Sequence, residues 1–451
     1  MLNRRGFFSV MTGAMSAGLT GCQGGASAPR GPEDLPPSQD PIFVAQAAPD
    51  LGLEAVLPVR AGADSFAPLG AALRSIQRGD RDARALVMIM GDSHTAGPVM
   101  VEHLRGLFQS RFGAIGVGRL SPGKSQRYFN PSAVTLGQTG EWTARNALRS
   151  TSPGPFGLTG YRLSGSGAGD IITLRSDELD GFDRVHLAMM AGPEAGSFRL
   201  CVDGNWIGPA TLKSPRPEFR PMFLDVPPAS REIAIELVGD GQVELLGWGL
   251  DRRGRGVLVE GFGINGATLA SLENRDPEIL RRELVAKPPA LIILEFGTNE
   301  ATDPDFDEAD YATALTRQIQ RLRQILPRSG ILLMGVPDAG RPVRLPPIQR
   351  GRRLVPQRQP TGCAAATPLI AISRVRAAQR AVAQSQRVGF FDWSAEVTHS
   401  PCRLQALAGG DAPLMRADFV HFTPDGYRLT AEKLHAHIMR GTGLGSRNSN
   451  A

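Results

Sequence analysis

The sequence predicts an α/β protein whose parallel sheet is interrupted by an inserted β-sandwich. Two separated regions alternate short apolar runs with amphipathic segments, which is typical of a parallel sheet covered by helices on both faces. Between them, at about residues 120–256, short strand-like runs are separated by clusters of Gly, Pro and Asp, as in antiparallel sheets. The length of 451 residues leaves room for two such domains.

The first α/β unit starts with an apolar strand at residues 85–90, which Gly91 ends. A helix is expected from about 98 to 112, with Pro98 in its first turn, where a missing N–H costs nothing. The same alternation returns from about residue 257. Further strands are expected at 257–262, 290–296, 331–336 and 388–392, with helices near 276–285, 307–325, 368–386 and 424–439.

The inserted region contains short apolar or alternating runs that predict a β-sandwich. An Asp203-Gly204 pair marks a hairpin turn, and the clearest strands are expected at 171–174, 185–189, 197–202 and 232–238. The alternative is a set of long loops, although structureless connections seldom exceed about 15 residues. Three aromatic side chains here suit either the sandwich core or a sugar-stacking surface, namely Tyr161, Trp206 and Trp248.

The N-terminal residues carry the features of an export signal. Arg4 and Arg5 precede an uncharged, moderately apolar stretch that is shorter than the roughly 20 apolar residues needed to cross a bilayer. It ends in LTGC at Cys22, which resembles the lipobox of bacterial lipoproteins. We expect a signal peptide over 1–22, a lipid anchor on Cys22 and a tether over 23–65, hence a periplasmic, membrane-anchored lipoprotein of a Gram-negative-type envelope. A short helix with an incidental cysteine is the alternative.

An oxidising compartment favours disulfide bonds. Cys363 and Cys402 lie 39 residues apart in the C-terminal third of the chain and are expected to pair, whereas Cys201 lies far away in the inserted region. The alternative is that they remain reduced, because pairing cannot be deduced from sequence alone. The chain has no CxxC and no HExxH motif, so no metal site is predicted.

The composition argues against nucleic-acid and nucleotide binding. The formal net charge is +6, but the 50 Lys and Arg residues are spread along the chain, so no basic stripe is predicted. Residues 118–125 fit the phosphate-binding pattern GxxxxGK[ST], which needs a buried strand before it and a helix after it. Pro131 disfavours that helix, so no nucleotide site is expected.

Three polar blocks stand at or near the ends of expected strands. Ser93 follows the first strand within GDSHT, Asn299 follows the strand at 290–296 within GTNE, and Asp418-x-x-His421 precedes the last helix. Open α/β sheets bind ligands at the carboxyl ends of their strands. A Ser hydroxyl becomes a nucleophile when a base such as His takes its proton, and an Asp can orient the imidazole. The pattern predicts a catalytic triad of Ser93, His421 and Asp418.

The negative oxygen of a tetrahedral intermediate needs hydrogen-bond donors. The backbone N–H of Ser93 and the side-chain amide of Asn299 are two candidates. A third is expected at Gly266 within GINGAT, where the missing side chain lets the backbone approach a substrate. His94 either lines the pocket or only fills the turn. No GxSxG motif occurs, which argues against the nucleophile elbow of α/β-hydrolases.

The blocks GDSH, GxNGA, GTNE and DxxH, in this order, resemble those of the SGNH (GDSL-type) hydrolases, most closely the branch of peptidoglycan O-acetylesterases. The resemblance implies a flavodoxin-like, three-layer hydrolase domain over 66–119 and 257–445. It also implies that 120–256 form an inserted, carbohydrate-binding-like β-sandwich. Two features depart from this branch: Pro98 replaces an acidic residue, and residues 341–362 form a basic, Pro-rich loop without a counterpart.

This resemblance implies a serine esterase that removes O-acetyl groups from a cell-envelope polysaccharide, namely O-acetylated peptidoglycan, through an acetyl-enzyme intermediate. Such an enzyme needs neither a metal nor an organic cofactor. Its partners would be the acetylated polysaccharide and the membrane that holds its lipid anchor. Two alternatives remain open. One is an O-acetyltransferase that uses the same triad on an envelope glycan, and the other is a non-catalytic, envelope-binding lipoprotein.

Overall fold

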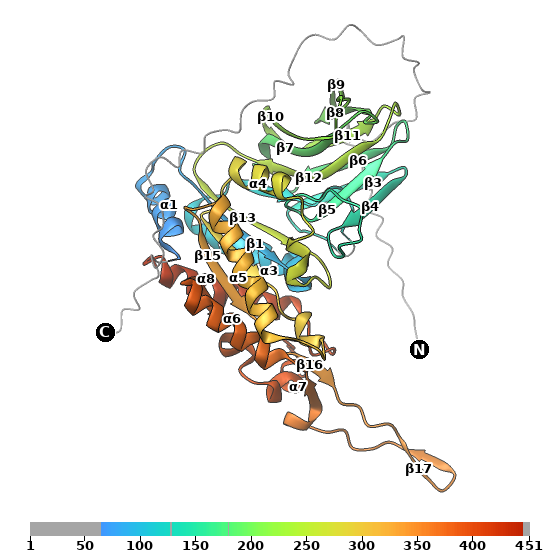
Figure 1. Ribbon diagram of the computed structural model, residues 1–451, viewed down its shortest axis with the longest axis vertical. Helices are drawn as coiled ribbons and strands as arrows, with labels where there is room; N and C mark the ends of the chain where they lie inside the picture. The colour runs from blue at the N-terminus through green and yellow to red at the C-terminus, as the bar shows by residue number, and fades with distance from the viewer. Residues whose placement is uncertain (1–64, 127–128, 179, 445–451) are drawn as a thin grey trace, which may run out of the picture.

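The computed structural model describes residues 65–126, 129–178 and 180–444. The expected signal peptide, the lipidation site at Cys22 and nearly all of the tether lie outside the described residues. Figure 1 shows a body of helices and a parallel sheet, a β-rich region on one side of it, and a thin hairpin that projects from the opposite end. In the described part of the chain, no helix is long and apolar enough to cross a membrane.

A five-stranded parallel sheet forms the centre of the α/β domain, and it confirms the predicted fold class. The strand order is β13-β1-β14-β15-β20, and every neighbouring pair is parallel. Numbered by chain position, this is the 2-1-3-4-5 order of flavodoxin-like sheets. The strands are β1 (Arg84–Gly91), β13 (Gly256–Gly263), β14 (Leu291–Glu295), β15 (Gly330–Gly335) and β20 (Gly389–Asp392).

Helices cover both faces of this sheet because its strands are apolar on both sides. In β1, Val87 and Ile89 point into one core, whereas Met88 and Met90 point into the other. The first core is closed by α1 (Ala67–Arg78), α3 (Pro98–Phe112) and α8 (Pro424–Gly441). The second is closed by α4 (Pro277–Ala286), α5 (Glu308–Ile325) and α6 (Ile372–Gln386). The result is the expected three-layer arrangement.

The inserted region consists of two packed antiparallel sheets, as predicted. One has the order β10-β7-β12-β5-β4 with β2 also paired to β12, and the other has the order β3-β6-β11-β8-β9. Apolar side chains of both sheets form one core between them. The strands are β2 (Gly116–Leu120), β3 (Val134–Thr139), β4 (Trp142–Asn146), β5 (Tyr161–Gly165), β6 (Ile171–Ser176), β7 (Phe182–Ala191), β8 (Ser197–Val202), β9 (Asn205–Thr211), β10 (Glu218–Ser230), β11 (Glu232–Leu237) and β12 (Val243–Asp251).

The structure separates the aromatic residues of the insert. Trp248 and Tyr161 are buried, whereas the side chain of Trp206 on β9 is 42% exposed beside the guanidinium of Arg199. Only Trp206 of the three therefore keeps a face that a sugar ring could reach. The GxxxxGK[ST] match begins within β2, a strand of the antiparallel sheet, and the described residues between β2 and β3 contain no helix.

A buried ion network joins the insert to the parallel sheet. Arg119 on β2 contacts the carboxylate of Glu260 on β13 at 2.7 Å, and Lys287 contacts the same carboxylate at 3.0 Å. Burial alone would raise the pKa of Glu260, but the two cations lower it to about 2. Removing either cation would leave a buried charge only partly compensated, which is strongly destabilising. The network therefore fixes the insert against the sheet.

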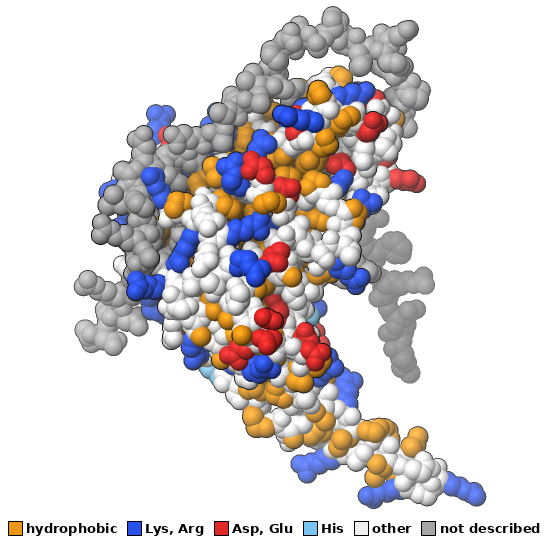
Figure 2. Space-filling model, in the orientation of Figure 1, with side chains coloured by type: hydrophobic (Ala, Val, Ile, Leu, Met, Phe, Trp, Pro, Cys, Tyr) orange, Lys and Arg blue, Asp and Glu red, His pale blue; other side chains and the backbone are white. Residues whose placement is uncertain are grey.

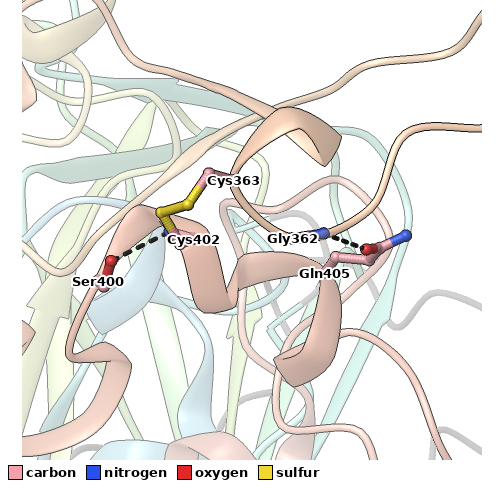
Figure 3. The surroundings of a disulfide bond; sticks show 5 residues. All are labelled: Gly362, Cys363, Ser400, Cys402 and Gln405. Carbon is pink, nitrogen blue, oxygen red and sulfur yellow. Dashed lines mark hydrogen bonds between the residues drawn. A yellow bond between two sulfur atoms is a disulfide. The ribbon is translucent and has the colours of Figure 1, made fainter.

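The chain after β15 forms two short strand pairs before α6. The pair β16 (Gly340–Pro342) and β19 (Ala366–Pro368) forms the base of a long hairpin, and β17 (Ile348–Arg350) and β18 (Arg353–Val355) form its end. A disulfide joins Cys363 to Cys402 at this base (Figure 3). It links η3 (Gly362–Ala365) to η5 (Pro401–Arg403), which is followed directly by α7 (Leu404–Leu407).

Candidate active site

Ser93 is presented by a sharp turn at the end of β1. The side chain of Asp92 caps the short helix α2 (Ser93–Ala96) by accepting a hydrogen bond from the His94 N–H at 2.9 Å. A Cβ on Gly91 would lie 2.4 Å from the Glu295 carboxylate, so only glycine fits the end of this strand. Because β13 and β14 flank β1, Ser93 lies where the strand order reverses, the usual ligand-binding place of such sheets.

The structure brings the three expected triad residues into one hydrogen-bonded chain. The hydroxyl oxygen of Ser93 lies 3.0 Å from His421 Nε2, and His421 Nδ1 lies 2.8 Å from a carboxylate oxygen of Asp418. The separation in sequence between Ser93 and His421 is 328 residues. This geometry lets the imidazole take the hydroxyl proton while the carboxylate holds the ring in one orientation.

The loop that carries Asp418 and His421 is fixed by its own backbone. The second carboxylate oxygen of Asp418 accepts hydrogen bonds from the N–H groups of Val420 and His421, each at 3.0 Å. Burial would raise the pKa of Asp418, but the hydrogen bond with the His421 side chain and these two N–H groups lower it on balance. Phe419 adopts the left-handed conformation with φ of 59°, which is unusual for a bulky residue. Asp418 is therefore held ionised and in place.

The three expected oxyanion donors differ in their surroundings. Within the described residues, no acceptor engages the backbone N–H of Ser93 or of Gly266, so both are available to a ligand. Gly266 is exposed and has φ of 78°, which favours glycine, while a Cβ there would meet nothing within 4 Å. Its conformation, more than close packing, accounts for the glycine. The Asn299 amide donates to the Ala267 carbonyl at 2.8 Å and to Asp92 at 3.3 Å.

A buried carboxyl pair lies beneath the nucleophile, and the sequence analysis missed it. Glu295, the last residue of β14, accepts hydrogen bonds from the Asp92 N–H at 3.3 Å and from the Thr95 hydroxyl at 2.9 Å. Burial raises the pKa of Asp92 to about 7, and burial together with the Asp92 charge raises that of Glu295 well above its usual range. Such a pair retains a proton near neutral pH. The signal that could have found it was a single acid ending an otherwise apolar strand.

The structure also decides the role of His94, which the sequence left open. Its side chain is fully buried, and Nδ1 lies 3.0 Å from the hydroxyl of Tyr427 on α8. Burial, and then the neighbouring His421, lower the pKa of His94 to about 3. A ring that stays neutral and buried cannot exchange protons with solvent near neutral pH. His94 therefore supports the wall behind His421.

Among the described residues, no group of three or more His, Cys, Asp or Glu side chains is arranged to hold a metal ion. The acids around Ser93 instead contact backbone N–H groups and hydroxyls, as Glu295 and Asp92 do. The arrangement consists of an activated hydroxyl, a base and free donors beside it. These are the parts that acyl transfer through a covalent intermediate requires.

Comparisons with known proteins agree with this chemistry. Residues 237–429 match the GDSL-like Lipase/Acylhydrolase family. No curated protein matches the sequence significantly. The fold is similar to a solved structure of a peptidoglycan O-acetylesterase, with 23% identity, a TM-score of 0.69, and coverage of 85% of this chain and 98% of that chain. Because the match covers 85% of this chain, it includes both the parallel-sheet domain and the insert.

Two further structures resemble smaller parts of the fold. An acetyl xylan esterase, AlAXEase, is 17% identical, covers 39% of this chain and 78% of its own, and gives a TM-score of 0.28. A family two carbohydrate esterase from Clostridium thermocellum is 11% identical, covers 67% of this chain and 100% of its own, and gives a TM-score of 0.26.

Proposed function

We propose that this chain, which matches the GDSL-like Lipase/Acylhydrolase family over residues 237–429, is an esterase that removes O-acetyl groups from a cell-envelope polysaccharide, namely O-acetylated peptidoglycan. The observation that carries the proposal is the Ser93–His421–Asp418 chain of hydrogen bonds at the switch point of the sheet. The substrate class is supported by the likeness of both domains to a structure described as a peptidoglycan O-acetylesterase.

The proposed reaction has two steps. The Ser93 hydroxyl attacks the acetyl carbonyl while His421 takes its proton, and the tetrahedral oxyanion is held by the N–H groups of Ser93 and Gly266 and by the Asn299 amide. The C–O bond to the sugar then breaks, and the sugar oxygen leaves with the proton from His421. The acetyl group remains on Ser93 as an ester. Water, deprotonated by His421, attacks this ester and releases acetate and free Ser93.

The exposure of the triad favours water as the acceptor of the acetyl group. The side chains of His421 and Asp418 are 37% and 47% exposed, so solvent reaches the base from outside. An O-acetyltransferase needs to keep water away from its acyl-enzyme, because hydrolysis would compete with transfer. Hydrolysis is therefore the proposed reaction, with transfer to a sugar hydroxyl as the alternative.

The test is acetate release from O-acetylated muropeptides beside acetylated xylan and a small acetyl ester. We expect release from all esters that fit the site, with the highest kcat/KM on the muropeptides. Acetate that appears on a sugar acceptor instead of in solution would establish transfer. Higher kcat/KM on xylan would overturn the peptidoglycan assignment while leaving the esterase intact.

The matched variants are Ser93→Ala and Ser110→Ala. Ser110 lies exposed on α3, where its hydroxyl only bonds the Leu107 carbonyl, so its removal should leave activity unchanged. Ser93→Ala should abolish acetate release on every substrate without altering the circular dichroism spectrum. A folded Ser93→Ala variant with wild-type activity would remove the catalytic assignment.

We also propose that the protein is exported and lipid-anchored to the periplasmic side of a membrane. The support is the sequence alone: Arg4-Arg5, the apolar stretch and the lipobox-like ending at Cys22. Expression with a radioactive fatty acid should label the wild type and leave Cys22→Ala unlabelled. Replacing Arg4 and Arg5 by Lys should block export. An unlabelled wild type would contradict the anchor.

A further inference from the structure

A hairpin of unusual composition projects from the hydrolase domain, and the proposed reaction does not use it. We call residues 341–362 the basic arm. In Figure 1 it extends away from the body beyond β16, and its outermost strands are β17 and β18. Its shape is fixed by internal bonds: the Gln359 side chain accepts from the Leu345 N–H at 2.8 Å and donates to the Leu345 carbonyl at 2.9 Å.

The base of the basic arm is held firmly to the body. The Gly340 N–H donates to the Phe419 carbonyl at 2.9 Å, and the Val343 N–H donates to the Ala365 carbonyl at 2.8 Å. The Cys363–Cys402 disulfide closes the same region, and the Gly362 N–H donates to the Gln405 side chain beside it (Figure 3). The arm is therefore a fixed projection of the domain.

The basic arm carries the net charge of the whole protein. It contains six Arg and no Asp, Glu, Lys or His, so the rest of the chain has 44 basic and 44 acidic residues. The interpretation that the basic residues are evenly spread was therefore wrong for this segment. Arg350 and Arg353 face each other directly across β17 and β18, with Arg352 in the turn between them. Like charges in that position repel, and an external anion would relieve the repulsion.

The basic arm also gathers exposed aliphatic side chains. Of seven large hydrophobic residues that the described chain exposes, three lie in the arm: Leu345, Ile348 and Leu354. Leu354 is the most exposed of the seven, at 69%, and it is the middle residue of β18, one residue beyond Arg353. Figure 2 shows the arm as a mixture of Arg and hydrophobic surface without acidic groups. Exposed aliphatic groups bordered by charged side chains are typical of surfaces that bind a partner or a membrane.

We propose that the tip of the basic arm docks on an anionic lipid surface. The arginines would pair with the phosphate groups of anionic lipids, whose surface potential attracts clustered basic side chains. Leu354 and Ile348 would enter the boundary between headgroups and acyl chains, which stabilises them relative to water. The neutral remainder of the chain has no comparable attraction, so the arm sets which end of the molecule faces the membrane.

The side chains favour a lipid over an acidic polysaccharide. Sugar rings are held by aromatic faces, and residues 341–362 contain no Phe, Trp or Tyr. A hydrated glycan offers no apolar phase for Leu354, Ile348 and Leu345, whereas a bilayer does. The proposal is independent of the acetylesterase assignment, because no residue of the basic arm belongs to the triad or to the oxyanion donors.

The test is co-sedimentation of the full chain with vesicles, using Cys22→Ala throughout to remove the expected acyl anchor. Vesicles that contain phosphatidylglycerol are compared with vesicles of phosphatidylcholine alone. Replacing Arg350, Arg352 and Arg353 together by Gln should weaken binding to the anionic vesicles by about 100-fold, because each basic residue near such a surface contributes about fivefold. Leu354→Ser should weaken it by about tenfold.

The matched control replaces Arg81, Arg145 and Arg149 by Gln, three exposed arginines outside the arm. This variant has the same net charge as the arm variant and should bind the vesicles within about threefold of the wild type. All variants should hydrolyse a small acetyl ester at the wild-type rate, which reports on folding. Equal loss in both triple variants, equal binding to neutral vesicles, or tighter binding to polygalacturonate than to anionic vesicles would each overturn the proposal.

Discussion

Replacing Asn299 by Ala tests how the oxyanion is held. The Asn299 amide follows β14 at the start of η2 (Glu300–Thr302) and donates to the Ala267 carbonyl at 2.8 Å and to Asp92 at 3.3 Å. The first bond fixes the amide, whereas the second is long and weak. One amide hydrogen is therefore held in place and ready to bond the oxyanion, which attracts it far more strongly than a neutral carbonyl does. We expect Asn299→Ala to lower kcat by about 10² to 10³, or about 2.7 to 4 kcal/mol.

The assay measures kcat and KM on a small acetyl ester together with the free energy of unfolding in urea. Asn274→Ala is the matched control, because the Asn274 amide also donates to a backbone carbonyl, that of Ala147, at 2.9 Å. Each variant should lose about 1 kcal/mol of unfolding free energy with its hydrogen bond. Only Asn299→Ala should lose kcat.

Two results would refute this reasoning. A raised KM with unchanged kcat for Asn299→Ala would make the amide a ground-state binding group. An equal loss of kcat in Asn274→Ala would show that a stability defect, and not the missing donor, lowers the rate.

Three further predictions concern the triad, the disulfide and a buried histidine. Asp418→Asn should lower kcat by about 10⁴ with little change in KM, because His421 then loses the carboxylate that orients it; wild-type kcat in steady-state assays would contradict the triad. Mass spectrometry of the unreduced protein should find a cross-linked peptide containing Cys363 and Cys402, and Cys402→Ser should lower the free energy of unfolding by about 3 to 4 kcal/mol less any native strain. Burial, then the nearby cations, lower the pKa of His186 to about 3, so its folded form stays neutral and its stabilising contribution is present above pH 6.5 and lost as the pH falls towards 3. At pH 5 that loss is about 2 kcal/mol. Between pH 7 and pH 5, the free energy of unfolding in urea should therefore fall by about 2 kcal/mol less in His186→Phe than in the wild type. The same pH dependence in both proteins would show that His186 is not the titrating group.

Local patterns predicted the strands of the parallel sheet and most of the helices around it, although they missed α1 and the strand pairs between β15 and α6. The apolar run at 85–90 became β1, and the runs near 290–296 and 331–336 became β14 and β15, because a strand buried on both faces is apolar at every position. Helix starts followed in the same way, as in α4, where Asp276 caps the first turn before Pro277. Such signals lie within a few residues of one another, so they can be read directly from the sequence where they occur.

Ser93 and Asn299 were accessible to sequence reasoning because they follow β1 and β14 closely, whereas Asp418 and His421 lie on the loop between α7 and α8 and were predicted from their residue types and from the order of the blocks. Parallel strands place their carboxyl ends on one edge of a sheet, so blocks at those ends converge whatever the strand order. In the structure the Ser93 hydroxyl lies 3.0 Å from His421 Nε2, and the Asn299 amide lies 3.3 Å from the carboxylate of Asp92, the residue before Ser93. The protonation state of each group could not be predicted from these sequence motifs.

Only the tertiary structure decided the electrostatics. The raised pKa of Glu295 depends on burial and on the charge of Asp92, which is 203 residues away and becomes a neighbour only because β14 pairs with β1. His94 stays neutral because it is buried beside Tyr427, which is 333 residues away in the sequence. Burial and charge pairing arise from long-range contacts that no local period encodes. The sequence by itself therefore determined the elements and the reactive groups, whereas the packing of distant segments determined their protonation and the projection of the basic arm.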